Sequence, residues 1–258
     1  MTMPADASDV GHLPRIGALL GVWAHPDDEA YLSSGLMSRV RNHGGRVVVV
    51  TATRGERGTD DPARWPPERL GAVRERELRA SLAEVGVHEH HWLHHGDGEL
   101  AGVPVSEGAA ELVPLIEDVA PDVIVTFGPE GMTGHADHRA ISAWVTEAWR
   151  RTGRRGDLWY ATLTQEFHRE WGELSEQLGV WMDDAEPPVT RPSDLSVTVR
   201  LTGSMLARKH RALRAHATQT RALEDLVGPA RYRDWWSTES FVPAERALVA
   251  GAADLGRG

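Results

Sequence analysis

Short apolar runs recur along the first two thirds of the chain, and amphipathic stretches separate them. Apolar runs at residues 16–23, 46–53 and 122–127, the second of them β-branched, predict strands, and a further short strand is expected at 90–93. Residues 157–163 have the same character and are expected to form a fifth strand. The spacing of these runs leaves room for a helix between each pair, as expected for a parallel sheet.

The stretches between these runs have helical periodicity. Apolar residues repeat every three to four positions in 29–42, 68–85 and 106–119, and a further helix begins near 135–138 and runs to residue 151. Strands alternating with such helices favour right-handed crossovers and an α/β fold. We therefore predict a Rossmann-like three-layer αβα architecture around a mostly parallel sheet.

The remaining third of the chain is less regular. Residues 164–194 are rich in Trp, Glu and Pro and predict an irregular excursion of loops and short helix. Residues 197–201 alternate like a strand, and 203–226 predict one long helix. No repeat or linker divides the sequence, so we expect a single domain over 1–258 with a loose tail at 1–14.

Composition excludes several classes of protein. The chain has 258 residues, no cysteine and a formal net charge of −10. Any metal must therefore be held by His, Asp or Glu, and a nucleic-acid partner is not expected because such proteins present a basic face. We also expect no membrane span and no secretory signal, and hence a cytoplasmic protein. The oligomeric state stays open, a homo-oligomer included.

The most informative motif follows the first apolar run. Residues 24–29 read Ala-His-Pro-Asp-Asp-Glu, which places metal-ligand types at the carboxyl end of a strand, where open α/β sheets bind ligands. His25 and Asp28 are three residues apart across a turn, so both can enter one crevice, while Asp27 is left free to handle protons. Taken alone, the aspartates could simply cap a helix.

A second motif follows the run at 122–127. Residues 134–139 read Gly-His-Ala-Asp-His-Arg, with His135 and His138 on one side of a first helical turn. A lone His-x-x-His is a weak signal. Because parallel strands end at one sheet edge, however, this pair and His25 are expected to meet there, and a zinc ion with nitrogen and oxygen ligands is suited to hydrolysis.

Together these motifs resemble the PIG-L/LmbE-like zinc-dependent N-deacetylases. The resemblance spans about residues 18–222, and Ala136, where the family more often has proline, is one departure. The segments that carry it are 24–29, 133–138, the Thr-x-Gly-Glu-x-Gly loop at 53–58, the Arg-x-x-Glu-Leu helix at 74–78 and the His-x-Thr-Gln element at 216–219.

The resemblance implies one Zn²⁺ per chain and a role for each motif residue. His25, Asp28 and His138 would hold the metal and leave one position open. Asp27 would be the general base, and His135 would donate to the oxyanion, assisted by Asp137. The implied substrate contacts are Glu56, Arg74 and Asp97.

Each of the remaining features has a structural alternative. Glu56 and Arg74 could form a pair that only holds a loop, and Asp97 could be a turn residue. The histidines between residues 88 and 95 are better explained as members of a short strand than as a metal site. His216 and Gln219 could support the metal site or serve structure alone, and tryptophans of the second half could line a sugar-binding wall.

The function that these observations favour is zinc-dependent removal of an N-acetyl group from an amino-sugar-containing small molecule. An amidase that cleaves a sugar-linked thiol conjugate and a non-catalytic zinc-binding interaction module are the alternatives. A Rossmann-like oxidoreductase is disfavoured, since the first strand runs into carboxylates instead of a Gly-x-Gly-x-x-Gly turn.

Overall fold

The parallel part of the predicted sheet is present. The computed structural model describes residues 13–182 and 185–246, so most of the predicted tail at 1–14 lies outside the described residues. Neighbouring strands follow the order β3-β2-β1-β4-β5, and all four pairings are parallel. These strands are β1 (Ala18–Trp23), β2 (Arg46–Thr53), β3 (Glu89–His95), β4 (Val123–Phe127) and β5 (Asp157–Thr164).

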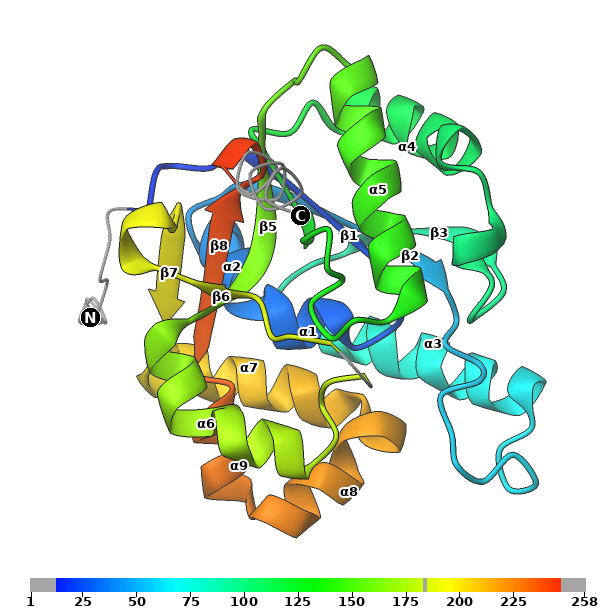
Figure 1. The fold of residues 1–258 in the computed structure, drawn as a ribbon, viewed down its shortest axis with the longest axis vertical. Coiled ribbons are helices and arrows are strands. Elements are labelled where there is room, and N and C mark those ends of the chain that lie inside the picture. Colours follow the sequence, from blue (N-terminus) through cyan, green and yellow to red (C-terminus); the bar gives the residue numbers. More distant parts are fainter. Residues whose placement is uncertain (1–12, 183–184, 247–258) are drawn as a thin grey trace, which may run out of the picture.

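Helices cover both faces of this sheet, which makes the fold a three-layer αβα sandwich (Figure 1). The crossover helices between β1 and β3 pack on one face, and those between β3 and β5 pack on the other. The first group is α1 (Asp28–Leu32), α2 (Ser34–Asn42) and α3 (Pro67–Glu84), and the second is α4 (Val105–Val119) and α5 (Ala136–Arg151), preceded by a 3₁₀ turn at Leu100–Gly102.

The strand order reverses beside β1. The chain moves outward from β1 through β2 to β3, and then returns through α4 to place β4 on the other side of β1. At such a switch point the loops that leave two adjacent strands diverge to opposite faces and open a crevice. The loop after β1 and the loop after β4, which carry the two histidine motifs, flank this crevice.

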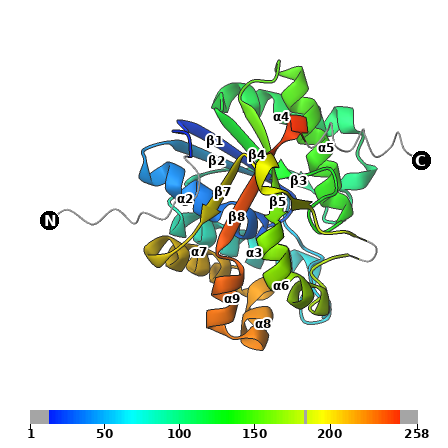
Figure 2. The same ribbon diagram turned by 60° about the vertical axis from the view of Figure 1, so that its left-hand side comes forward.

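The second half of the chain is more regular than its sequence indicates. Beyond β5, the sheet continues with two antiparallel strands, and a group of helices packs below them (Figure 2). These elements are α6 (Gln165–Gln177), β6 (Val189–Thr190), a 3₁₀ turn at Pro192–Asp194, β7 (Val197–Arg200), α7 (Gly203–Ala215), α8 (Ala217–Val227), α9 (Pro229–Trp235) and β8 (Thr238–Pro243).

Strand β8 had no counterpart in the sequence-based expectation. It pairs with both β5 and β7, and its buried positions include Glu239 and Ser240, so it shows no apolar pattern. Glu239 forms a buried ion pair with Lys209 of α7 (2.7 Å) and accepts the backbone N–H groups of Gly35 and Leu36. The buried charge of Glu239 is thus satisfied by groups from segments that are distant in the sequence, which local sequence pattern does not reveal.

Two segments that were each predicted to form one continuous helix form two helices instead. Residues 29–42 form α1 and α2, separated at Ser33, whose hydroxyl donates to the carbonyl of Glu29. Such a side-chain bond competes with the helical pattern. Residues 203–226 form α7 and α8, separated at His216. None of the helices in the described ranges is long and apolar enough to cross a membrane.

Candidate active site

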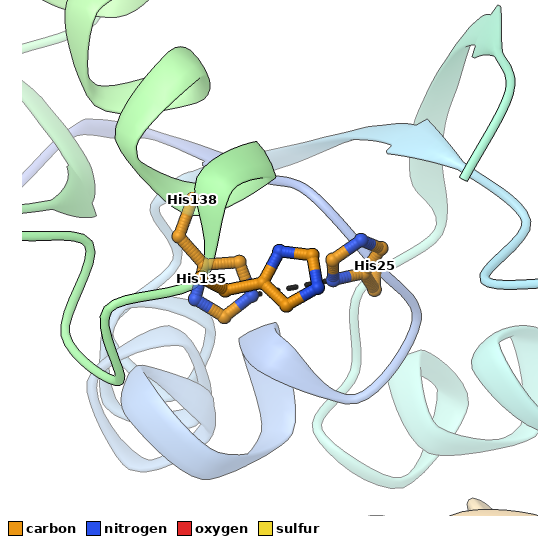
Figure 3. Close-up of side chains that lie close together, drawn as sticks. All are labelled: His25, His135 and His138. Carbon is orange, nitrogen blue, oxygen red and sulfur yellow. Dashed lines mark hydrogen bonds between the residues drawn. The ribbon is translucent and has the colours of Figure 1, made fainter. Parts of the chain in front are cut away.

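The loops after β1 and β4 bring the three sequence-predicted metal residues together. His25 Nδ1 lies 3.2 Å from His138 Nε2 (Figure 3). The carboxylate of Asp28 lies 3.4 Å from His138 Nε2 and 3.8 Å from His25 Nδ1. Ligand atoms held 2.0–2.2 Å from a tetrahedral zinc ion are ~3.4 Å apart, close to the separation of the two ring nitrogens. The two Asp28 distances belong to different oxygens, Oδ1 to His138 and Oδ2 to His25.

Hydrogen bonds on the outer sides of both rings fix which nitrogen carries a proton. His25 Nε2 lies 3.1 Å from carboxylate oxygens of both Asp97 and Asp137, and it donates there. His138 Nδ1 donates to the carbonyl of Gly131 at 3.0 Å. In their neutral forms the two rings therefore turn lone pairs toward each other, as metal-ligating histidines supported by carboxylates and carbonyls do.

Two lone pairs at this separation require a cation between them. Burial favours a neutral His25, but hydrogen bonds to Asp137 and Asp97 and the charge of Asp28 outweigh burial and raise the pKa of His25 to about 10. Burial and the charge on His25 move the pKa of His138 well below its ordinary value. The site thus attracts one positive charge, which a proton or a metal ion can supply.

The geometry also brings other ligand sets together. Nitrogens of His25, His135 and His138 lie within 4.8 Å of one another, as do ligand atoms of His25, Asp97 and Asp137. The described residues therefore contain a site that can bind a metal, and in the first of these groups His135 stands beside His25 and His138 where the resemblance implied Asp28.

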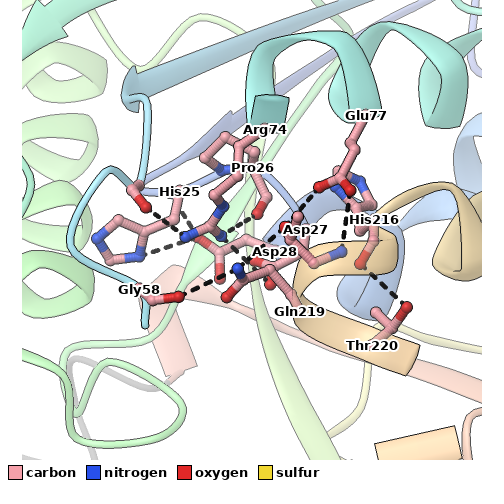
Figure 4. Close-up of polar contacts among 12 residues, drawn as sticks. His25, Pro26, Asp27, Asp28, Gly58, Arg74, Glu77, His216, Gln219 and Thr220 are labelled. Carbon is pink, nitrogen blue, oxygen red and sulfur yellow. Dashed lines mark hydrogen bonds and ion pairs between the residues drawn. The ribbon is translucent and has the colours of Figure 1, made fainter. Parts of the chain in front are cut away.

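Asp27, which lies in the turn between β1 and α1, has a strained backbone conformation. Its φ of 112° lies in the left-handed region that residues with a side chain rarely adopt. Burial raises the pKa of its carboxyl to about 6, although Arg74, 3.4 Å away, acts in the opposite direction (Figure 4). A carboxyl with this pKa can accept a proton near neutral pH.

His135 and Asp137 occupy the N-terminus of α5 and have different surroundings. His135 caps the helix, and its Nδ1 accepts the backbone N–H of Asp137 at 3.1 Å. The proton of the neutral ring is therefore on Nε2. Asp137 is fully buried and accepts from His25 and from the N–H groups of Gly98 and Leu100. It supports His25 from behind and does not line the pocket.

A pocket of about 570 Å³ opens above these residues. His25, Asp27, Asp28, His135 and His138 all line it. A further part of its lining comes from the second half of the chain and is mostly apolar. These residues are Leu163, Leu178, Gly179, Val180, Trp181, Gln219, Leu223 and Trp236. Both halves of the chain therefore contribute to one site.

Comparison with known proteins agrees with this geometry. The family model described as PIG-L, GlcNAc-PI de-N-acetylase, matches residues 20–149. The chain belongs to the PIG-L family. A curated relative, the 1D-myo-inositol 2-acetamido-2-deoxy-alpha-D-glucopyranoside deacetylase of Actinosynnema mirum, is 32% identical over 240 residues, which cover 83% of this chain and 84% of the relative.

Solved structures of deacetylases share the fold. The N,N'-diacetylchitobiose deacetylase from Pyrococcus horikoshii has a TM-score of 0.61 at 20% identity, covering 88% of this chain and 84% of its own. The zinc-inhibited form of the teicoplanin deacetylase Orf2 has a TM-score of 0.60 at 16% identity, with coverage of 87% and 98%. At these sequence identities the similarity shows a shared fold only, and this fold agrees with the predicted α/β architecture.

The three residues proposed from the PIG-L resemblance as substrate contacts have different positions. Arg74 and Asp97 line the pocket, whereas Glu56 is not among its lining residues. Glu56 accepts the backbone N–H of Asp97 at 2.9 Å. Arg74 donates to the carbonyls of Pro26 and Gly55 instead of pairing with Glu56. Glu56 therefore holds the loop that carries Asp97.

The carboxy-terminal element of this PIG-L chain reaches the site through two contacts. His216 Nε2 lies 2.8 Å from the carboxylate of Glu29, and Gln219 donates to the carbonyl of Gly58 and lines the pocket (Figure 4). Glu29 was not singled out from the sequence, although it ends the first motif. Its position directly after Asp28 was the only signal for it.

The histidines of β3 lie apart from this centre. His90 contacts the hydroxyl of Thr51 at 3.0 Å, and His95 lies 3.0 Å from Glu111. His91 and His94 are exposed. Their side chains thus have separate neighbours, as the alternation of a strand predicts.

Proposed function

We propose that the protein is a zinc-dependent N-deacetylase that converts the acetamide of an amino-sugar-containing small molecule into a free amine and acetate. The observation that carries this proposal is the approach of His25 Nδ1 to His138 Nε2 at 3.2 Å, beside the carboxylate of Asp28. Membership in the PIG-L family and the deacetylase relatives support it.

His25, Asp28 and His138 are the residues proposed to hold the zinc ion. Their donor set of two imidazoles and a carboxylate, with no thiolate, is typical of hydrolytic zinc sites that keep a position open. A bound zinc ion supplies Lewis acidity, which lowers the pKa of water to ~7 and polarises a carbonyl.

The proton chemistry belongs to two other residues of the pocket. Asp27 is proposed to take the proton of the attacking water and to pass it to the departing amine nitrogen. Its raised pKa of about 6 suits both transfers. His135 is proposed to donate from Nε2 to the carbonyl oxygen as negative charge develops there, since its Nδ1 is occupied by the backbone of Asp137.

Asp137, buried behind His25, is proposed to assist by fixing the orientation of this ring. Arg74 and Asp97 are the proposed contacts for sugar hydroxyls, because both line the pocket. A pocket of about 570 Å³ lies within the range of small-molecule sites. Since residues 25–138 supply the proposed catalytic groups and residues 163–236 supply further lining of the same pocket, we propose that the chain acts as a single domain.

Release of free amine by zinc-loaded protein tests this function. The panel contains N-acetylglucosaminyl-inositol, N-acetylglucosamine, N,N'-diacetylchitobiose and an N-acylated sugar-linked thiol conjugate. We expect turnover of an acetylated amino sugar, and the Asp27→Asn variant serves as the matched inactive control. Turnover of the thiol conjugate alone would favour an amidase, and stoichiometric zinc without any hydrolysis would favour a non-catalytic module.

A further inference from the structure

A pair of tyrosine hydroxyls joins the pocket wall to the core. Tyr31 lies on α1, and its backbone N–H donates to the carbonyl of Asp27 at 3.0 Å, so the two residues are one helical turn apart. The Tyr31 side chain is partly exposed and lines the pocket. Its hydroxyl oxygen lies 2.7 Å from that of Tyr232 on α9.

The direction of this hydrogen bond follows from the burial of Tyr232. The side chain of Tyr232 is 0% exposed, and among the described residues Tyr31 is the hydrogen-bond partner of its hydroxyl. If Tyr31 donated, the proton of Tyr232 would be left buried without an acceptor, at a cost of about 1–3 kcal/mol. On this ground Tyr232 is assigned as the donor, which leaves the proton of Tyr31 for an acceptor in the pocket that its side chain lines.

The surroundings of Tyr31 make this proton a selective donor. The ring of Trp236 contacts the ring of Tyr31 edge-on, with centroids 4.6 Å apart, and Leu32, Leu163 and Leu223 line the same pocket. A hydrogen bond in apolar surroundings is stronger than in water, and a hydroxyl that already accepts one becomes a better donor. An aromatic and aliphatic wall with one hydroxyl complements the face of a pyranose ring that carries both C–H groups and oxygen.

We propose that Tyr31 positions the substrate by donating a hydrogen bond to a neutral hydroxyl or ether oxygen of the amino sugar, and that Tyr232 orients the Tyr31 hydroxyl for this contact. The inference rests on the proposed deacetylase function. It assigns to α9 and to the turn after it a part in substrate selection, although both lie outside the segment matched by the family model.

The test is a double-mutant cycle with N-acetylglucosaminyl-inositol as the substrate. We expect Tyr31→Phe to raise KM about tenfold, as loss of one partly buried hydrogen bond does, with kcat within about twofold. Tyr232→Phe should raise KM about threefold, because Tyr31 stays but loses its orientation. The double variant should match Tyr31→Phe, since Tyr232 acts only through Tyr31.

Tyr160→Phe is the matched control. The Tyr160 hydroxyl makes a comparable buried bond to Thr146 at 2.6 Å but does not line the pocket, so its loss should leave KM unchanged. The proposal would be overturned if Tyr31→Phe kept the wild-type KM, or if Tyr160→Phe raised KM as much as Tyr31→Phe does. It would also be overturned if the KM increases of Tyr31→Phe and Tyr232→Phe multiplied in the double variant.

Binding without turnover separates this inference from the proposed function. N-acetylglucosamine is titrated into wild type and Tyr31→Phe, with tryptophan fluorescence as the readout. If the wild type hydrolyses nothing, a roughly tenfold weaker Kd in Tyr31→Phe still supports the role of Tyr31 while the deacetylase proposal fails. An unchanged Kd, or no binding by the wild type, overturns the role of Tyr31.

Discussion

His216 and Glu29, which are 187 residues apart in the sequence, form a fully buried pair with Nε2 and Oε1 separated by 2.8 Å. Burial alone would favour the neutral form of both side chains. The charge and hydrogen bond of each partner outweigh this effect of burial, so the pKa of His216 is raised and that of Glu29 is lowered. The second oxygen of Glu29 accepts the backbone N–H of Asp27 at 2.9 Å. The pair thus holds Asp27 in its left-handed conformation, which costs a residue with a side chain about 1–2 kcal/mol.

His216→Gln should therefore impair the general base without removing the metal. Glutamine can still donate to Glu29 but carries no charge, so Asp27 loses part of its support. We expect kcat to fall about 10- to 100-fold at unchanged zinc content, the range found for groups that support site residues from behind. Steady-state kinetics and metal analysis measure both.

His210→Gln is the matched control for this variant. His210 lies on α7, which ends just before His216, and pairs with a carboxylate, Glu224 at 2.8 Å, but it has no hydrogen bond to Glu29. It should keep wild-type kcat. Equal losses in both variants would show that the effect is general destabilisation of the second half of the chain.

Asp27→Asn should abolish most of the turnover and leave zinc bound. Asparagine tolerates a positive φ, so the loop keeps its shape, but its amide cannot take a proton. We expect kcat to fall by roughly 10²–10⁴-fold. Zinc stoichiometry and Tm, measured beside kcat, verify the intact site, and full activity would refute the role of Asp27.

Removal of zinc should lower stability as well as activity. Without metal, only a proton shared between His25 Nδ1 and His138 Nε2, 3.2 Å apart, can take the place of the ion. A ligand that binds only the folded state stabilises it by about 2.7 kcal/mol at 100 times its Kd. We expect Tm to fall on chelation and to recover when zinc is added back.

The zinc response of Tm should disappear in His138→Ala and persist in His95→Ala. His95, on β3, pairs with Glu111 and not with the proposed ligands. Thermal unfolding with and without zinc compares the two variants. An undiminished zinc response in His138→Ala would argue that other residues hold the ion.

His90 should make the protein less stable in mild acid. Burial lowers the pKa of His90 from 6.5 to about 4. Between these values the unfolded chain binds a proton that the folded chain excludes, so the free energy of unfolding decreases as pH falls from 6.5 towards 4. At 1.36 kcal/mol per pKa unit, this contribution is on the order of 2–3 kcal/mol.

Denaturant unfolding between pH 4 and 7 measures this effect. His90→Gln cannot titrate but can still bond to Thr51, so its stability should depend less on pH in this window. His91→Gln, at an exposed neighbouring position, should keep the wild-type slope. Parallel curves for wild type and His90→Gln would contradict the prediction.

Local pattern in the sequence was sufficient for much of the fold. Strands β1, β2 and β4 are short apolar runs whose burial on both faces is visible in their composition, and α5 has the periodicity of a half-buried helix. Because parallel strands end at one edge, the motifs at 24–29 and 133–138 could also be expected to meet there. Separation of the atoms of His25, Asp28 and His138 by 3.2–3.8 Å agrees with that expectation.

Only the tertiary structure decided which polar groups pair across long distances. Strand β8 carries a buried glutamate that is tolerated because Lys209 and the N-terminus of α2 reach it, and no local periodicity encodes that contact. The same holds for the partners of His216 and Arg74. A side chain's type and spacing determine which bonds it can make, but its actual partner depends on how separate elements pack, since a buried charge must be satisfied by whatever group that packing brings within reach.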